Sequence, residues 1–206
     1  PDSIEPTALK TRYEESFHEW DSVATTLYGR ADAQIKSLNG NRLHDINCMG
    51  EGMMIAVLDG GFKNVDKIPA FGKVDIRGTR DFIYPASPSV YYELDHGTKV
   101  LSTMTIQQPH YYIGTAPKAS YWLLRCEDGQ SEQEVEEDYW AIAAVFADSV
   151  GCERINSSLG YNNFDKGHVS HKLWQLDGHS TFISHSASMV AKKGMILINS
   201  AGNSGM

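Results

Sequence analysis

The sequence predicts an α/β fold, with a doubly wound and mainly parallel sheet between helices in a three-layer αβα arrangement. Two short apolar runs, at residues 53–58 and 119–125, predict buried strands, and two further runs predict strands at residues 154–158 and 195–199. Two segments with helical periodicity, residues 131–150 and 180–193, separate the last three runs. This strand–helix–strand alternation is typical of right-handed crossovers in a parallel sheet.

The first strand ends in a charged residue that needs a partner. Asp59 directly follows the apolar run, at the carboxyl end where open α/β sheets bind ligands. An unpaired buried carboxylate would be costly, so we expect Asp59 to meet His96. His96 begins a predicted helix in which Val100, Leu101 and Met104 share one face.

The other segments are less regular. Residues 1–27 are interpreted as an N-terminal extension or leader remnant, with an amphipathic pattern at Leu9, Tyr13, Phe17 and Trp20. The main domain is expected at residues 28–206, beginning with turns and short helices up to residue 47. Residues 63–93 contain three prolines and predict loops with a short strand near residues 74–76. The start at Pro1, without a methionine, favours a processed N-terminus.

Residues 131–150 have the strongest helical pattern of the chain. Ser131 with Glu134 predicts a capping box, and the expected buried stripe is Val135, Tyr139, Ile142 and Phe146. We interpret the acidic run as a solvated helix start rather than a cation site; it consists of Glu132, Glu134, Glu136 and Glu137. The second helix, residues 180–193, is expected to stop at Gly194.

The composition and charge of the chain argue against several classes of protein function. A content of 41% hydrophobic and 10% aromatic residues in 206 positions is typical of a globular domain. The net charge of −8 argues against nucleic acid as a partner, and no apolar run is long enough to span a membrane. Cys48, Cys126 and Cys152 are expected to be buried free thiols, with one disulfide as the alternative. Four histidines fit no zinc spacing and are expected in solvent: His168, His171, His179 and His185.

Five segments in order resemble the subtilisin-like (S8) serine proteases. IAVLDGGF at residues 55–62 is similar to the aspartate motif of that family, and DHGTKVLS at residues 95–102 to its histidine motif. GTAPKA at residues 114–119, INSSLG at residues 155–160 and NSAGN at residues 199–203 resemble the turn, the substrate strand and the oxyanion segment. The order of aspartate, histidine and asparagine is also the order of the family.

The resemblance implies a role for each matching residue. Asp59 would orient His96, His96 would act as general base and then general acid, and Asn203 would donate to the oxyanion. Ser158, Leu159 and Gly160 would pair with the substrate backbone as an added strand. One wall of the S1 pocket would be formed by Ser200, Ala201 and Gly202, and residues 127–130 would edge the S2 to S4 sites.

The chain departs from the family pattern at three places. Lys99 replaces the second histidine of the histidine motif, and Gly60 replaces the serine or threonine after the aspartate. The nucleophile motif G-T-S-x-A is missing; Ser188 has a superficially similar context but precedes Asn203 and is interpreted as a plain helical serine. The resemblance therefore implies the N-terminal part of a catalytic domain, with an incomplete sheet. Its expected partner is a C-terminal complement that carries the serine.

The predicted function is a serine endopeptidase that acts on a peptide or protein substrate. The family implies a secreted, periplasmic or cell-surface location and no required cofactor, with calcium as an optional structural ion. Asp66 is a conceivable ligand, but the loop before His96 lacks the calcium-loop pattern of the family, so no metal site is assigned. Acidic residues at Glu127, Asp128, Glu132 and Glu134 point to basic groups on the substrate.

Two alternatives stay open. The first is a non-catalytic pseudo-peptidase that binds peptides by strand addition. The second, a nucleotide-binding enzyme, is disfavoured because neither glycine-rich phosphate motif occurs.

Overall fold

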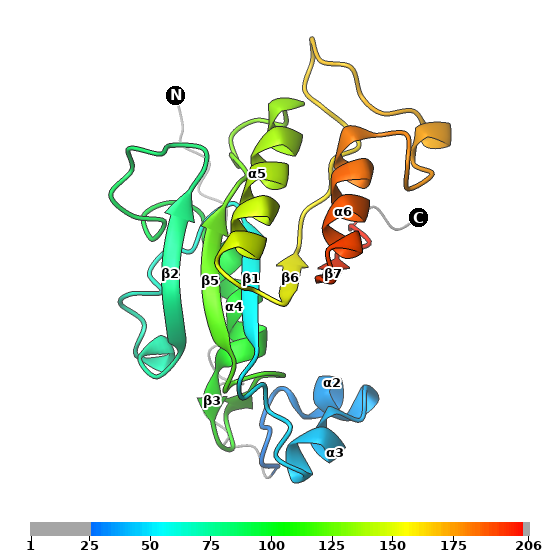
Figure 1. Ribbon diagram of the computed structural model, residues 1–206. Helices are drawn as coiled ribbons and strands as arrows, with labels where there is room; N and C mark the ends of the chain where they lie inside the picture. Colours follow the sequence, from blue (N-terminus) through cyan, green and yellow to red (C-terminus); the bar gives the residue numbers. More distant parts are fainter. Residues whose placement is uncertain (1–25, 204–206) are drawn as a thin grey trace, which may run out of the picture.

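A five-stranded parallel sheet forms the centre of the computed structural model, which describes residues 26–203. The strand order is β2-β5-β1-β6-β7, so β1, the first strand along the chain, lies in the middle of the sheet (Figure 1). All four strand pairs are parallel. The strands are β1 (Met54–Asp59), β2 (Asp75–Asp81), β5 (Ser120–Arg125), β6 (Arg154–Ser157) and β7 (Ile196–Asn199).

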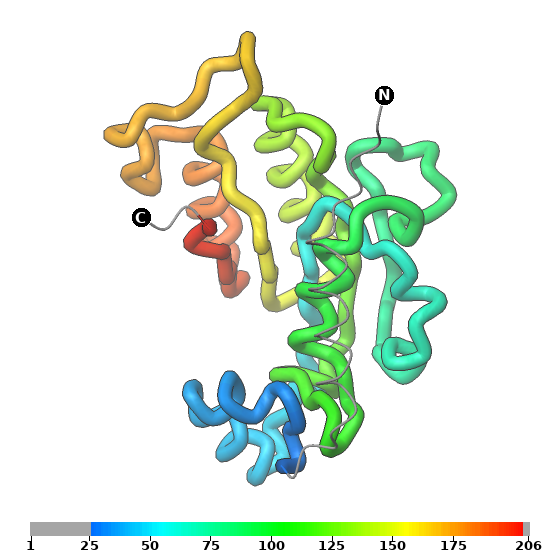
Figure 2. The backbone as a smooth tube through the Cα atoms, turned by 180° about the vertical axis from the view of Figure 1, so that it is seen from behind, coloured from blue at the N-terminus to red at the C-terminus, as the bar shows by residue number. Residues whose placement is uncertain are grey.

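Helices cover both faces of this sheet. The helices α5 (Val135–Ser149) and α6 (Phe182–Lys192) lie on one face, and α4 (His96–Thr105) lies on the other, which is turned to the viewer in Figure 2. One apolar cluster joins the sheet to α5 and α6 around Trp140, and a second joins it to α4 around Leu101. The predicted α/β class, with its three layers, is confirmed.

Smaller elements lie at the amino end of the sheet. Two short helices, α2 (Asp32–Ser37) and α3 (Gly40–Asp45), occupy the segment where turns and short helices are predicted. A two-stranded antiparallel hairpin, β3 (Gln107–Gln108) with β4 (Tyr112–Ile113), follows α4 and was not predicted. Two single 3₁₀ turns complete the described elements, η1 (Pro69–Phe71) and η2 (Leu173–Gln175).

The four strands predicted from these runs lie within one residue of their expected limits, and β7 is largely exposed, with Ile196 and Ile198 51% and 55% exposed. The strand near residues 74–76 is longer than predicted, because β2 continues to Asp81 as the edge strand of the sheet. Its charged residues and Gly78 conceal the strand pattern. The register shifts between Ile76 and Gly78, where a Cβ on residue 78 would lie 2.4 Å from the Trp122 ring.

The predicted start of α5 is wrong, and its predicted buried stripe is confirmed only for Tyr139 and Phe146, which pack against the core. The helix begins at Val135 after Glu134, and the Ser131 hydroxyl instead accepts a bond from the Gln133 amide. Val135 and Ile142 are 39% and 54% exposed. The buried face carries small residues, which allow the helix to approach the sheet closely around one large anchor: Trp140, Ala143, Ala144 and Ala147.

Two acidic residues of the helix start are buried, which corrects the prediction of a solvated run. Glu136 is 1% exposed and accepts the backbone N–H groups of Asp128 and Gln133, both at 2.8 Å. Glu137 is 5% exposed and lies 2.6 Å from His171 Nε2. His171 is therefore held against α5, whereas the other three histidines of the predicted set are exposed, as expected: His168, His179 and His185.

The predictions for the cysteines and for the N-terminal segment have different outcomes. All three cysteines are free; Cys126 and Cys152 are buried as predicted, but Cys48 is exposed. The predicted helix at residues 9–20 and most of the predicted extension at residues 1–27 lie outside the described residues. Between residues 26 and 203, no helix has both the length and the apolar composition needed to cross a membrane.

Candidate active site

Asp59 and His96, which are 37 residues apart in sequence, meet at the carboxyl edge of the sheet. Asp59 is the last residue of β1, and His96 is the first residue of α4. His96 Nδ1 lies 2.9 Å from one carboxylate oxygen of Asp59 and 3.0 Å from the other. The Gly60 backbone N–H also donates to Asp59, at 2.8 Å. The predicted pairing is therefore present in the structure.

Glycines let the two elements come this close. A Cβ on Gly97, the second residue of α4, would lie 2.5 Å from the Gly61 carbonyl oxygen and 2.9 Å from the Asp59 Cβ. A Cβ on Gly61 would lie 2.5 Å from the Glu93 carbonyl oxygen. Real Cβ atoms do not approach backbone so closely, so only glycine allows the start of α4 to rest on the end of β1.

The environments of the two side chains are opposite. Asp59 is completely buried, whereas 55% of the His96 side chain is exposed. Burial raises the pKa of Asp59, and the hydrogen bond and charge of His96 act in the opposite direction, together with the Gly60 and Gly61 amides. A carboxylate that accepts from Nδ1 places the ring proton on that nitrogen. The exposed Nε2 is then free to accept a proton from a group in solvent.

Arg125 supports this arrangement from the neighbouring strand, and sequence reasoning missed it. Its side chain is 3% exposed and donates from Nε to the Gly60 carbonyl at 2.9 Å. It also contacts Asp81 at 3.1 Å and Glu93 at 2.6 Å. The sequence contained one signal for this role: an arginine within a buried apolar run must have hydrogen-bond acceptors or carboxylates as partners.

The predicted substrate-binding segments emerge from the same edge. Leu58 is level with Ser157 across β1 and β6, and Ser157 is level with Asn199 across β6 and β7. The Asn199 side-chain amide donates to the Leu159 and Ser200 carbonyls, at 3.2 and 2.8 Å, and so ties the two segments together. This role of Asn199 was not predicted.

The individual predicted residues differ in exposure. Ser158 is half-buried, Leu159 is buried in the core beside α5, and Gly160 is exposed. The other four predicted residues are all exposed: Ser200, Ala201, Gly202 and Asn203. No hydrogen bond between described residues joins Asn203 to Asp59 or His96. The structure thus brings Asp59 and His96 together, and separately the two strand extensions.

A pocket of about 210 Å³ opens beside these extensions. It lies between α5, α6 and the ends of β6 and β7, and Leu159, Gly160 and Asn199 contribute to its wall. Most of its remaining lining is apolar, including Trp140 and Ile183. Among residues 26–203, no group of three or more His, Cys, Asp or Glu side chains is placed to hold a metal ion.

Comparison with known proteins finds similarity among solved structures. No protein-family model matches the chain, and no curated protein matches it either. Among solved structures, the chain is similar to the crystal structure of MycP1 with the N-terminal propeptide removed, with a TM-score of 0.62 and 20% identity. The chain has a subtilisin-like fold. The match covers 84% of this chain and 50% of the MycP1 chain, so this chain spans half the length of that neighbour.

Proposed function

We propose that this chain supplies the acid–base half of the active site of a subtilisin-like serine endopeptidase. The observation that carries the proposal is the bond between the fully buried Asp59 carboxylate and His96 Nδ1, with the rest of the imidazole facing solvent. In this role Asp59 holds the ring and balances the imidazolium, and His96 Nε2 takes the proton of the nucleophile. The nucleophilic serine would come from a segment outside this sequence.

The strand extensions would hold the substrate. Residues 158–160 would pair with an extended peptide backbone, with Asn203 as oxyanion donor and residues 200–202 as one wall of the S1 pocket. The level ends of β6 and β7 support this placement, because both extensions leave the sheet at the carboxyl edge where β1 also ends. The proposed location is secreted, periplasmic or at the cell surface, and calcium is a possible structural ion.

Labelling with a fluorophosphonate probe tests the proposal on the longest natural form of the protein. We expect a single modified serine, mapped by mass spectrometry to a position beyond residue 206. Because His96 activates that serine, His96→Ala is expected to reduce labelling by about 10⁴-fold or more. Labelling of Ser188, or labelling that survives His96→Ala unchanged, would contradict the proposed mechanism.

One observation keeps a second candidate open. His96 Nε2 forms no hydrogen bond with any residue between 26 and 203, so no hydroxyl of this region already occupies the nucleophile position. A pseudo-peptidase would bind extended peptides at residues 158–160 without cleaving them. Saturable peptide binding together with no fluorophosphonate labelling of the longest form would favour this candidate.

A further inference from the structure

The backbone of Leu94 is strained two residues before His96. Its φ is +37°, in the left-handed region, which a bulky side chain rarely adopts. The other non-glycine residues with a positive φ among residues 26–203 are three asparagines and one histidine, types that tolerate this region better. Such a conformation persists only where the surrounding structure imposes it. The contacts that impose it on Leu94 therefore bear on the position of His96.

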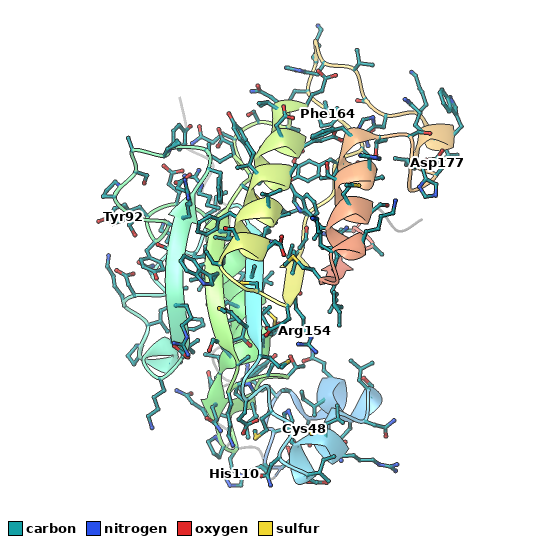
Figure 3. The ribbon with its side chains drawn as sticks, in the orientation of Figure 1. Cys48, Tyr92, His110, Arg154, Phe164 and Asp177 are labelled. Carbon is teal, nitrogen blue, oxygen red and sulfur yellow. The ribbon has the colours of Figure 1, made fainter. Side chains whose placement is uncertain are left out.

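Part of the restraint on Leu94 comes from the segment that follows β1. The Lys63 backbone N–H donates to the Leu94 carbonyl at 2.9 Å. The Leu94 side chain lies against two glycines: a Cβ on Gly60 would be 3.0 Å from Leu94 Cδ1, and a Cβ on Gly129 would be closer still. The loop before α4, on which Figure 3 labels Tyr92, therefore rests on the chain that leaves the carboxyl end of β1.

Glu93 adds an ionic contact at the strained turn. Its carboxylate lies 2.6 Å from Nη2 of Arg125, whose side chain is 3% exposed. Nε of Arg125 donates at the same time to the Gly60 carbonyl, at 2.9 Å. One planar guanidinium therefore bonds both to the residue after Asp59 and to the residue three before His96. Because the guanidinium is a rigid fork, it fixes these two chain segments relative to each other.

The exposure of Glu93 limits what its ion pair contributes to stability. Its side chain is 49% exposed, so the pair with Arg125 adds little to the free energy of unfolding. The His96 ring, in contrast, depends on its placement, because within residues 26–203 it bonds only to Asp59, at 2.9 and 3.0 Å. A displacement of the start of α4 by about 1 Å would lengthen this bond beyond hydrogen-bond range.

We propose that Glu93 is a positioning residue for His96. Its bond to Arg125 holds the strained Leu94 turn, and the turn in its place keeps the imidazole against Asp59. The inference rests on the proposed function, because the position of the ring affects catalysis only if His96 is the general base. The positioning itself is measured without any hydrolysis.

Nitrogen-15 NMR of the longest natural form, labelled at histidine, reads the tautomer of His96. At a pH where the ring is neutral, we expect the proton on Nδ1, because the Asp59 carboxylate accepts from that nitrogen. In Glu93→Ala we expect the tautomer protonated on Nε2 to become populated, because the ring leaves the carboxylate. Glu93→Gln keeps a neutral acceptor for Arg125 and is expected to restore most of the Nδ1 form.

Two variants control for effects other than position. Asp95→Ala also removes a carboxylate close to His96 in sequence, from an exposed pair with Lys99, and is expected to retain the Nδ1 tautomer. Glu51→Ala removes a glutamate of nearly the same exposure, 45%, from its pair with Lys118 at the amino end of the sheet. It is expected to leave the His96 signals unchanged.

The rate of fluorophosphonate labelling gives a second readout, which separates positioning from binding. With saturating probe, we expect Glu93→Ala to lower the labelling rate about tenfold, because a displaced base is less effective. The probe concentration at half-maximal rate is expected to change little. A raised half-maximal concentration with an unchanged maximal rate would make Glu93 a substrate contact and would overturn the inference.

Three NMR results would also overturn it. An unchanged His96 tautomer in Glu93→Ala would mean that the Leu94 turn holds without the ion pair. An equal change in Asp95→Ala would assign the effect to local charge, and an equal change in Glu51→Ala would assign it to a general loss of stability. These results do not depend on labelling, so the positioning of His96 and the proposed function can fail separately.

Discussion

Replacing Arg125 by methionine tests how the site is supported. The guanidinium is 3% exposed and its partner Asp81 is 4% exposed, so the substitution leaves a buried carboxylate without its cation. Removing one member of a buried pair costs about 3–5 kcal/mol. Asp81 still accepts the Ile83 and Tyr84 N–H groups, which places the expected cost near the lower end for this pair.

The other contacts of Arg125 raise the expected total only modestly. The Gly60 carbonyl loses its donor, which costs about 1 kcal/mol. The Glu93 pair adds at most about 1 kcal/mol, because that carboxylate is 49% exposed. We therefore expect Arg125→Met to lower the free energy of unfolding by about 3–5 kcal/mol.

Urea denaturation followed by tryptophan fluorescence measures this effect. Arg77→Met is the matched control, because Arg77 pairs with Asp75 in solvent, with 58% and 50% of the side chains exposed, and its loss is expected to cost less than about 1 kcal/mol. Adding Asp81→Asn to Arg125→Met is expected to recover about 1 kcal/mol or more. A cost below about 1 kcal/mol for Arg125→Met, or no recovery in the double variant, would refute the reasoning.

Three further predictions concern the site and its surroundings. Gly97→Ala places a Cβ 2.5 Å from the Gly61 carbonyl oxygen, so we expect about 1–3 kcal/mol of destabilisation and a shifted His96 ring resonance; an unperturbed ring resonance would argue against the close approach. His171→Ala leaves Glu137 buried without its donor and should speed hydrogen exchange in residues 162–171, whereas His179→Ala in solvent should not. Glu127 has a pKa raised from 4.5 to about 8 on folding, so the stability contributed by its protonated form is complete below about pH 4.5 and lost as the pH rises through 8. The free energy of unfolding, measured by denaturation, is therefore expected to fall less between pH 5 and pH 9 in Glu127→Gln than in the unchanged protein. An equal fall in both proteins would contradict the raised pKa of Glu127.

The long loop that precedes α6 illustrates what periodicity misses. Its polar composition predicts a solvated connection, yet Phe164, which is labelled in Figure 3, packs edge-on against His171, with ring centroids 5.3 Å apart. His171 also lies against Glu137. Glu132 and Asp165 add two hydrogen bonds between the loop and the start of α5. The contacts with Glu137 and Glu132 join residues 34 and 33 positions apart, so no local pattern encodes them.

The same limit explains the errors at α5. Val135 and Ile142 follow a helical spacing, but which side of the helix meets the sheet depends on where the sheet lies. The alanines and Trp140 form that side because they fit between the helix and β1, β5 and β6. Glu136 is buried for a similar reason, since the backbone of the loop at Asp128 folds over it.

The sequence by itself determined the positions of the four strands and the parallel α/β class, because apolar runs and helical periodicity are local patterns. The pairing of Asp59 with His96, which lie 37 residues apart, was implied by the resemblance of their two motifs to those of a known family. Only the tertiary structure decided that Arg125 lies beneath Gly60 and that Glu137 takes His171. Each of these contacts depends on which groups, distant in sequence, are buried next to one another. The cost of leaving a buried charge unpaired is set by those neighbours in space and not by neighbours in the chain.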